Sequence, residues 1–250
     1  MRLLQFTDTH LPATPGTQVR GVATGETLAR CVRHAARHHP TPQAILLTGD
    51  LAHDDAGGYA QIRSSFGGAG VPVHCLPGNH DEAEALKRGL AGAPFDHALA
   101  RRHGRWLVVM LNSNVAGENH GHLDGDELER LDAALAENAD AWALVCLHHH
   151  PVPHGSRWLD ELMLDNPDEF FAVLARHAQV RGIAWGHTHQ PLEGMRGPVR
   201  LMGTPSTCMQ FAQNADEFEV DTRPPGYRWL DLEDGGGIVS GVEWVEPADD

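Results

Sequence analysis

The sequence predicts an α/β domain whose sheets are largely parallel. Three observations support this fold class: short apolar runs, amphipathic segments that alternate with them, and turn residues that close most of the runs. The 250 residues are enough for one well-buried domain and short for two independent ones. Hydrophobic residues make up 41% and charged residues 21%, so ordinary globular folding is expected.

The expected strands are brief and rich in β-branched residues or leucine. They cover residues 2–7, 44–48, 71–76, 106–111, 142–147, 183–185 and 199–202. The helices expected between them cover residues 26–39, 59–66, 82–90, 126–137 and 167–177. Asp124 is placed to cap the fourth helix, and Asn166 followed by Pro167 is a start signal for the fifth.

The composition of the sequence changes after residue 204. Residues 213–225 are polar and rich in turn formers, and two strands are expected at residues 227–232 and 238–245 around the turn Gly235-Gly236-Gly237. We therefore expect a main domain over residues 1–205. Residues 206–250 would be a C-terminal extension that packs on this domain and includes a β-hairpin.

Charge and composition exclude several classes of partner. The 19 Lys and Arg residues against 34 Asp and Glu residues give a net charge of −15, which disfavours DNA or RNA. No apolar run approaches the roughly 20 residues of a membrane helix, and the first residues leave no room for a secretory signal. The four cysteines are far apart and are expected to be reduced packing residues. These features predict a cytoplasmic protein.

Five polar clusters each follow an apolar run. They are Asp8-Thr9-His10, Gly49-Asp50, Gly78-Asn79-His80-Asp81, His148-His149-His150-Pro151 and Gly186-His187-Thr188-His189. If the runs are strands, every cluster lies at a carboxyl end, where α/β sheets bind their ligands. Any one cluster alone is explained by a polar loop, a turn or a helix cap. An incidental origin of all five at once is improbable.

The chemical content of these clusters predicts a metal site. Asp8 and His10 are two residues apart, so extended backbone points both to one side, and His187 and His189 repeat this spacing. Imidazoles, carboxylates and an amide oxygen suit Fe, Mn, Zn or Co better than Ca or Mg. Seven protein ligands are too many for one ion and about right for two, with Asp50 able to bridge them.

The ordered set resembles the calcineurin-like metallophosphoesterases, whose pattern is DxH, GD, GNH[DE], a lone H and GHxH. The resemblance implies a four-layer α-β-β-α sandwich with mixed sheets. It implies a first metal held by Asp8, His10, Asp50 and His189, and a second held by Asp50, Asn79, His187 and one histidine of residues 148–150. The family's spacing to Pro151 selects His149, with His148 as the fallback.

The same resemblance implies the residues that act on the substrate. His80 would contact phosphate or protonate the leaving oxygen, and Asp81 would orient it. Substrate contacts are expected from Asn79, His80, His10 and His120, the last in the loop after the fourth strand. His53 and His150 receive no role from the resemblance.

Further segments narrow the resemblance to bacterial class III 3',5'-cyclic-AMP phosphodiesterases, over about residues 3–232. They are Asp8-Thr9-His10-Leu11, Gly21-Val22 with Thr24 and Glu26, His120-Gly121, Gly155-Ser156-Arg157-Trp158-Leu159-Asp160, Thr204-Pro205-Ser206-Thr207-Cys208 with Gln210-Phe211, Asp221-Thr222 and Pro225-Gly226-Tyr227-Arg228. Asn112-Ser113-Asn114 departs from the Asp-Ser that is common at that place. This resemblance implies hydrolysis of 3',5'-cyclic AMP to 5'-AMP by a metal-bridging hydroxide.

The implied cofactors are two divalent or trivalent metal ions, an Fe and Mn pair first and Zn or Co next. The implied partner is a small nucleotide, with no nucleic acid and no membrane, and a homodimer is compatible with the chain. Two other functions stay open. One is a related phosphodiesterase or phosphomonoesterase that acts on glycerophosphodiesters, 2',3'-cyclic nucleotides or other small phosphoesters. The other is a catalytically silent interaction scaffold, which the intact ligand set disfavours.

Overall fold

Successive residues of the central strands enter two different hydrophobic cores. In the computed structural model, which describes residues 1–247, Leu3 of β1 (Arg2–Phe6) packs between the sheets, whereas Leu4 packs against helices. Leu46 and Leu47 of β2 (Ala44–Thr48) divide in the same way. Burial on both faces explains why these strands appear in the sequence as continuous apolar runs.

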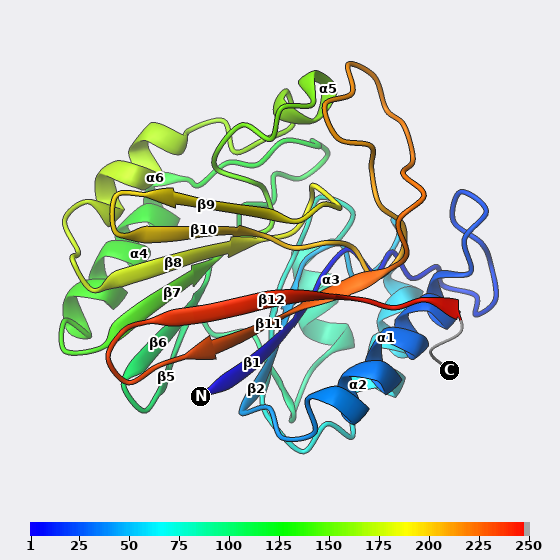
Figure 1. Cartoon of the computed structure of the whole chain (residues 1–250), viewed down its shortest axis with the longest axis horizontal. Helices are drawn as coiled ribbons and strands as arrows, with labels where there is room; N and C mark the ends of the chain where they lie inside the picture. The colour runs from blue at the N-terminus through cyan, green and yellow to red at the C-terminus, as the bar shows by residue number, and fades with distance from the viewer. Residues whose placement is uncertain (248–250) are drawn as a thin grey trace.

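The strands form two six-stranded mixed sheets that lie face to face (Figure 1). The first sheet has the order β12-β11-β1-β2-β3-β4 and the second the order β5-β6-β7-β8-β10-β9. The remaining strands are β3 (Val73–Leu76), β4 (Phe95–Asp96), β5 (Ala100–His103), β6 (Trp106–Met110), β7 (Trp142–Cys146), β8 (Val180–Trp185), β9 (Leu192–Arg196), β10 (Val199–Gly203), β11 (Gly226–Leu232) and β12 (Ile238–Trp244). Strands β1 to β4 run parallel, as do β6, β7, β8 and β10.

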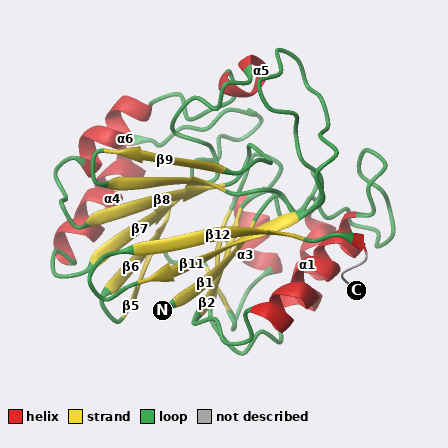
Figure 2. Cartoon of the chain, in the orientation of Figure 1, coloured by secondary structure: helices red, strands yellow, loops and turns green. Residues whose placement is uncertain are grey.

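Helices cover the outer face of each sheet (Figure 2). On the first sheet they are α1 (Thr24–His38), α2 (Tyr59–Phe66) and α3 (Ala83–Gly89), and on the second α4 (Gly125–Glu137) and α6 (Pro167–Leu174). The short α5 (Arg157–Asp160) and the 3₁₀ turn η1 (Ala56–Gly58) belong to connecting segments. Asp124 caps α4 as expected, accepting a hydrogen bond of 2.8 Å from the Glu127 amide. The layer order α-β-β-α confirms the predicted fold.

The C-terminal hairpin extends the first sheet. Strand β11 pairs antiparallel with β1, and β12 pairs antiparallel with β11. The buried guanidinium of Arg228 donates to the Gly203 carbonyl at 2.7 Å and forms an ion pair with Glu193, so it ties the hairpin to the second sheet. A domain boundary at residue 205 stays a prediction, and residues 248–250 of the expected extension lie outside the described residues.

Short strands at the sheet edges are the main elements that the sequence did not predict. Strands β4, β5 and β9 have two, four and five residues, and their burial is partial. All four cysteines are free and buried, as expected. Among residues 1–247 no helix has the length and apolar character needed to cross a membrane.

Candidate metal centre

Five of the predicted ligand residues adopt a left-handed backbone conformation. Their φ angles are 52° at Asp8, 44° at His10, 51° at Asp50, 62° at His187 and 48° at His189. All five lie two to four residues beyond the ends of strands β1, β2 and β8, where the chain turns. This conformation is unfavourable for residues with a Cβ atom, and such strain concentrates at functional sites.

A first group of ligand atoms forms around Asp8, His10 and His189. The Nε2 atoms of His10 and His189 are 3.1 Å apart, and His189 Nε2 lies 3.3 Å from Asp8 Oδ1. Asp50 Oδ2 lies 3.6 Å from His10 Nε2. Atoms that each bind one ion at roughly 2.1 Å are separated by about 3 to 3.6 Å, so these separations suit ligands of a common cation.

The hydrogen bonds behind this group leave its imidazole lone pairs free for a cation. His189 Nδ1 donates to the Met209 carbonyl at 2.7 Å, so its Nε2 carries a lone pair. His10 Nδ1 faces His53 Nδ1 at 3.2 Å, and a proton on His10 Nδ1 leaves its Nε2 free in the same way. Two such lone pairs repel at 3.1 Å unless a positive charge lies between them, which is the usual arrangement of metal-binding histidines.

A second group shares Asp50 with the first. His148 Nε2 lies 3.4 Å from Asp50 Oδ2 and 3.3 Å from Asn79 Oδ1, while its Nδ1 faces the Thr48 carbonyl at 2.8 Å. Ring nitrogens of His148, His149 and His187 lie within 4.8 Å of one another. The Nε2 atoms of His149 and His187 are buried and have no hydrogen-bond partner among the described residues. A bound metal ion would satisfy such buried ring nitrogens by accepting their lone pairs.

His149, the preferred ligand of residues 148–150, and the fallback His148 face different neighbours in the structure. Strand β7 ends at Cys146, whose side chain packs between the two sheets, and the alternation of side chains carries His148 to the same side. His148 therefore faces Asp50 and Asn79, whereas His149 Nδ1 lies 2.8 Å from Ser113 Oγ. The number of residues between each histidine and Pro151 does not show to which side of the strand its side chain points.

Two motif glycines leave the space that the ligand side chains occupy. A Cβ atom on Gly78 would lie 2.2 Å from Asp50 Oδ1 and 2.7 Å from His148 Cε1. A Cβ atom on Gly186 would lie 2.0 Å from Thr7 Oγ1 and 2.7 Å from Asp8 Oδ2. The glycines of the GNH and GHxH motifs are thus required by close packing against the centre.

Electrostatics in the centre combine two neutral imidazoles with the charged pair of Asp50 and His148. Burial lowers the pKa of His10 and of His187 well below the usual value, so both imidazoles are neutral. Burial alone would raise the pKa of Asp50, but the neighbouring His148 and His10 hold it well below its usual range. Burial would lower the pKa of His148, yet the Asp50 carboxylate raises it to about 9. Without a metal ion, an imidazolium at His148 therefore supplies the positive charge that Asp50 requires.

In the structure His80 pairs with Asp54, whereas the resemblance implied Asp81 as its partner. His80 Nδ1 lies 2.8 Å from Asp54 Oδ1, and its backbone amide donates to Asp50 Oδ1 at 2.9 Å. The carboxylate of Asp81 is instead occupied by hydrogen bonds at 3.0 Å from the amides of Leu51, Ala52 and Gly78 and from the Tyr59 hydroxyl. Asp81 is therefore a buried clamp for the loops beneath the site, and burial together with Asp50 raises its pKa to about 6.

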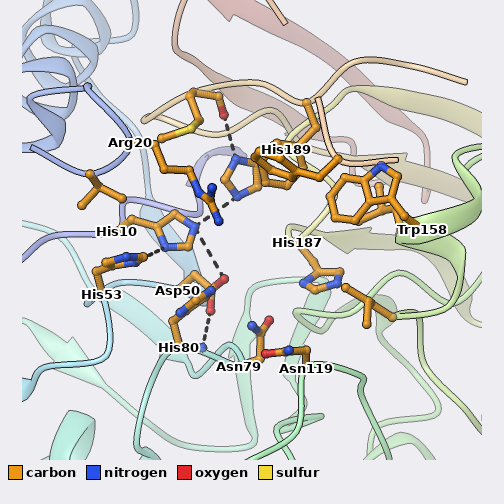
Figure 3. A pocket seen from close by; sticks show the side chains of 16 residues that line it. His10, Arg20, Asp50, His53, Asn79, His80, Asn119, Trp158, His187 and His189 are labelled. Carbon is orange, nitrogen blue, oxygen red and sulfur yellow. Dashed lines mark hydrogen bonds and ion pairs between the residues drawn. The ribbon is translucent and has the colours of Figure 1, made fainter. Parts of the chain in front are cut away.

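A cavity of about 240 Å³ opens above both groups (Figure 3). Its lining includes the predicted residues His10, Asp50, Asn79, His80, His187 and His189. The predicted substrate residue His120 does not line it, because its ring lies 3.6 Å from Asp165 and 3.9 Å from Glu118. Its neighbour Asn119 lines the cavity instead, as does His53, which receives no role from the family resemblance. The position of His53 three residues after Asp50 was its only signal.

Two face-to-face mixed sheets with clustered carboxylates and imidazoles at their strand ends define the architecture of a metallophosphoesterase. The chain belongs to the calcineurin-like phosphoesterase family, whose model matches residues 1–191.

Curated relatives match the chain over nearly its full length. It is 38% identical to the 3',5'-cyclic adenosine monophosphate phosphodiesterase CpdA of Pseudomonas aeruginosa, over 98% of this chain and 90% of that protein. It is 36% identical to the protein of the same name from Escherichia coli K12, over 97% and 89%. Among solved structures, a dimetal phosphatase from Danio rerio has a TM-score of 0.64 at 12% identity, over 92% and 94% of the two chains. This last likeness concerns the fold alone.

Proposed function

We propose that this protein is a metal-dependent phosphodiesterase that hydrolyses 3',5'-cyclic AMP to 5'-AMP. The observation that carries the proposal is the pair of ligand groups joined by Asp50 on the floor of one cavity. Near full-length similarity to cyclic-AMP phosphodiesterases supports the choice of substrate. A small monoanion also suits a chain with a net charge of −15 better than a long polyanion does.

Four residues would hold the first ion: Asp8, His10, Asp50 and His189. Four would hold the second: Asp50, Asn79, His187 and His148, with His149 next to them. The unpartnered ring nitrogens and the mixed nitrogen and oxygen donors fit Fe and Mn, and next Zn or Co. Bound cations would acidify a water molecule and offset the negative charge that builds on the phosphate oxygens.

His80 is proposed to hold the proton that the leaving 3'-oxygen receives. Burial would lower the pKa of His80, but the Asp50 carboxylate and the hydrogen bond to Asp54 raise it above its usual value. An imidazolium is thereby available at the edge of the cavity, with Asp54 fixing the orientation of its ring. Asn79 and His10 line the floor of the same cavity and would contact the phosphate there.

A substrate panel on metal-reconstituted protein tests the proposal. Turnover of 3',5'-cyclic AMP should exceed that of 2',3'-cyclic AMP and of a glycerophosphodiester, with 5'-AMP as the product. The Asp50→Ala variant, prepared in parallel, shows which turnover belongs to this centre. Cyclic AMP as the poorest of the three substrates would overturn the proposal. A cytoplasmic location, the lack of nucleic-acid and membrane partners, and a homodimer stay predictions.

A further inference from the structure

Three aromatic side chains form one wall of the cavity, which we call the aromatic wall: Trp158, Phe211 and Phe218. Their ring centroids lie 5.2 to 5.3 Å apart in all three pairs, and the planes meet at 68°, 75° and 69°. All three line the cavity that contains the metal-ligand groups. Edge-to-face contacts of this kind hold rings in fixed positions and leave ring faces for other groups.

The aromatic wall lies directly beside the metal centre. The ring of Phe211 stacks on that of His189, with centroids 3.9 Å apart and planes 11° from parallel. Figure 3 shows Trp158 and Arg20 bordering the cavity on the side of His189, away from His80 and Asn79. A ligand whose phosphate lies over the centre would therefore extend its remaining part along this wall.

The wall is held in place by contacts between two segments that are far apart in the sequence. The Ser156 hydroxyl donates to the Ala212 carbonyl at 3.4 Å and accepts from the Ala215 amide at 3.3 Å. The segments are residues 155–160 and 210–222, and neither supplies a proposed metal ligand. Within them, residues 155–160, 210–211 and 221–222 resemble cyclic-AMP phosphodiesterases. The metal centre therefore leaves the role of these segments unexplained.

Two features of the wall point to a flat, polar-edged ligand. Trp158 Nε1 is a buried donor without a hydrogen-bond partner among the described residues, on a ring that lines the cavity. The Arg20 guanidinium lies over the Phe218 ring, 4.5 Å from its centroid, so a planar cationic group already stacks on one face of this ring. Arg20 is also the one Lys or Arg side chain among the described residues that line the cavity.

We propose that the aromatic wall binds the adenine base of the substrate and so selects nucleotides over other phosphodiesters. This inference rests on the proposed function, because it takes the phosphate position from the metal centre. A purine has π faces that stack on aromatic rings and edge nitrogens that accept hydrogen bonds, which the wall and Trp158 Nε1 match. A glycerol or alkyl group would fill the same space without using either property.

Binding of the product 5'-AMP and of ribose 5-phosphate, its analogue without the base, tests the inference without any turnover. Calorimetric titration of the metal-loaded protein would compare 5'-AMP with ribose 5-phosphate. We expect 5'-AMP to bind roughly tenfold or more tightly, since stacking on an aromatic side chain is worth that much per base. In the Phe218→Leu variant this preference should shrink several-fold while the affinity for ribose 5-phosphate stays the same. Phe218 is 40% exposed, so its replacement leaves the core intact.

Two further variants make the outcome decisive. Val220→Ala alters an exposed side chain of the same segment that does not line the cavity, and it should keep the full preference. Phe218→Tyr retains a ring face and should also keep it. Equal affinities of the wild-type protein for both ligands, or an equal loss of both in Phe218→Leu, would overturn the inference. A base preference without turnover of cyclic AMP would instead refute the proposed function and leave the wall's role intact.

Discussion

The Nε2 atoms of His10 and His189 lie 3.1 Å apart although 179 positions separate the two residues along the chain. His10 follows β1 of the first sheet and His189 follows β8 of the second. The metal centre therefore spans both sheets, at the place where the carboxyl ends of two sets of parallel strands meet. Neither sheet alone carries a complete set of ligands, so the packing of the two sheets creates the site.

Replacing Asp50 by alanine should remove both metal ions together with the activity. Asp50 Oδ2 lies close to ring nitrogens of both groups, at 3.6 Å from His10 Nε2 and 3.4 Å from His148 Nε2. Elemental analysis after dialysis should show a loss of more than half of the metal per chain. Asp216→Ala, at an exposed carboxylate, is the matched control and should keep its metal. Full occupancy in the Asp50 variant would contradict a shared ligand.

His80→Ala should keep its metal and lose rate. Its side chain pairs with Asp54 and lines the cavity, and general acids of this kind contribute roughly 10²- to 10⁴-fold to turnover. We expect kcat to fall by about that factor with metal content unchanged. Asp54→Asn should lower kcat less, because it weakens the orientation of the imidazole without removing it. An unchanged kcat in His80→Ala would exclude the proton-donor role.

Variants of the adjacent histidines His148 and His149 distinguish the ligand of the second ion. His148→Ala should lower the affinity for one metal equivalent by at least tenfold, since His148 Nε2 lies near both Asp50 and Asn79. His149→Ala should have a smaller effect, through the neighbouring His187. Titration with Mn²⁺ monitored by electron paramagnetic resonance measures both affinities. The reverse order would restore the ligand that the sequence spacing suggested.

Sequence reasoning located the floor of the centre because each ligand follows a strand within a few residues. It failed where the answer depends on how a loop folds or on which side a residue faces. Asp81 is adjacent to His80 in sequence, yet the turn directs its carboxylate to three backbone amides, and Asp54 from another loop meets the imidazole. His148 and His149 are adjacent in the sequence but face Asp50 and Ser113 respectively, and the choice between them as a ligand stays a prediction. The short edge strand β4 has too few residues for any periodic signal.

A buried histidine far from the metal centre should make stability depend on pH. His74 of β3 lies 2.9 Å from His103 of β5, a contact between the two sheets, and Asp96 lies 3.3 Å from its other ring nitrogen. Burial, followed by the nearby His103, lowers the pKa of His74 to about 4 despite the opposing Asp96 carboxylate. The unfolded chain has the ordinary value of 6.5 and therefore binds a proton that the folded chain rejects between these two values.

The unfolding free energy should therefore fall as the pH decreases from 6.5 towards 4. From the two pKa values, His74 accounts for a loss of about 2 kcal/mol between pH 7 and pH 5. Urea unfolding of the wild type and of His74→Gln at both pH values measures this difference. The variant should lose less stability by about that amount. The same pH dependence in wild type and His74→Gln would contradict a lowered pKa of His74 in the folded chain. A side chain with equal protonation in the folded and unfolded states contributes nothing to the slope of unfolding free energy against pH.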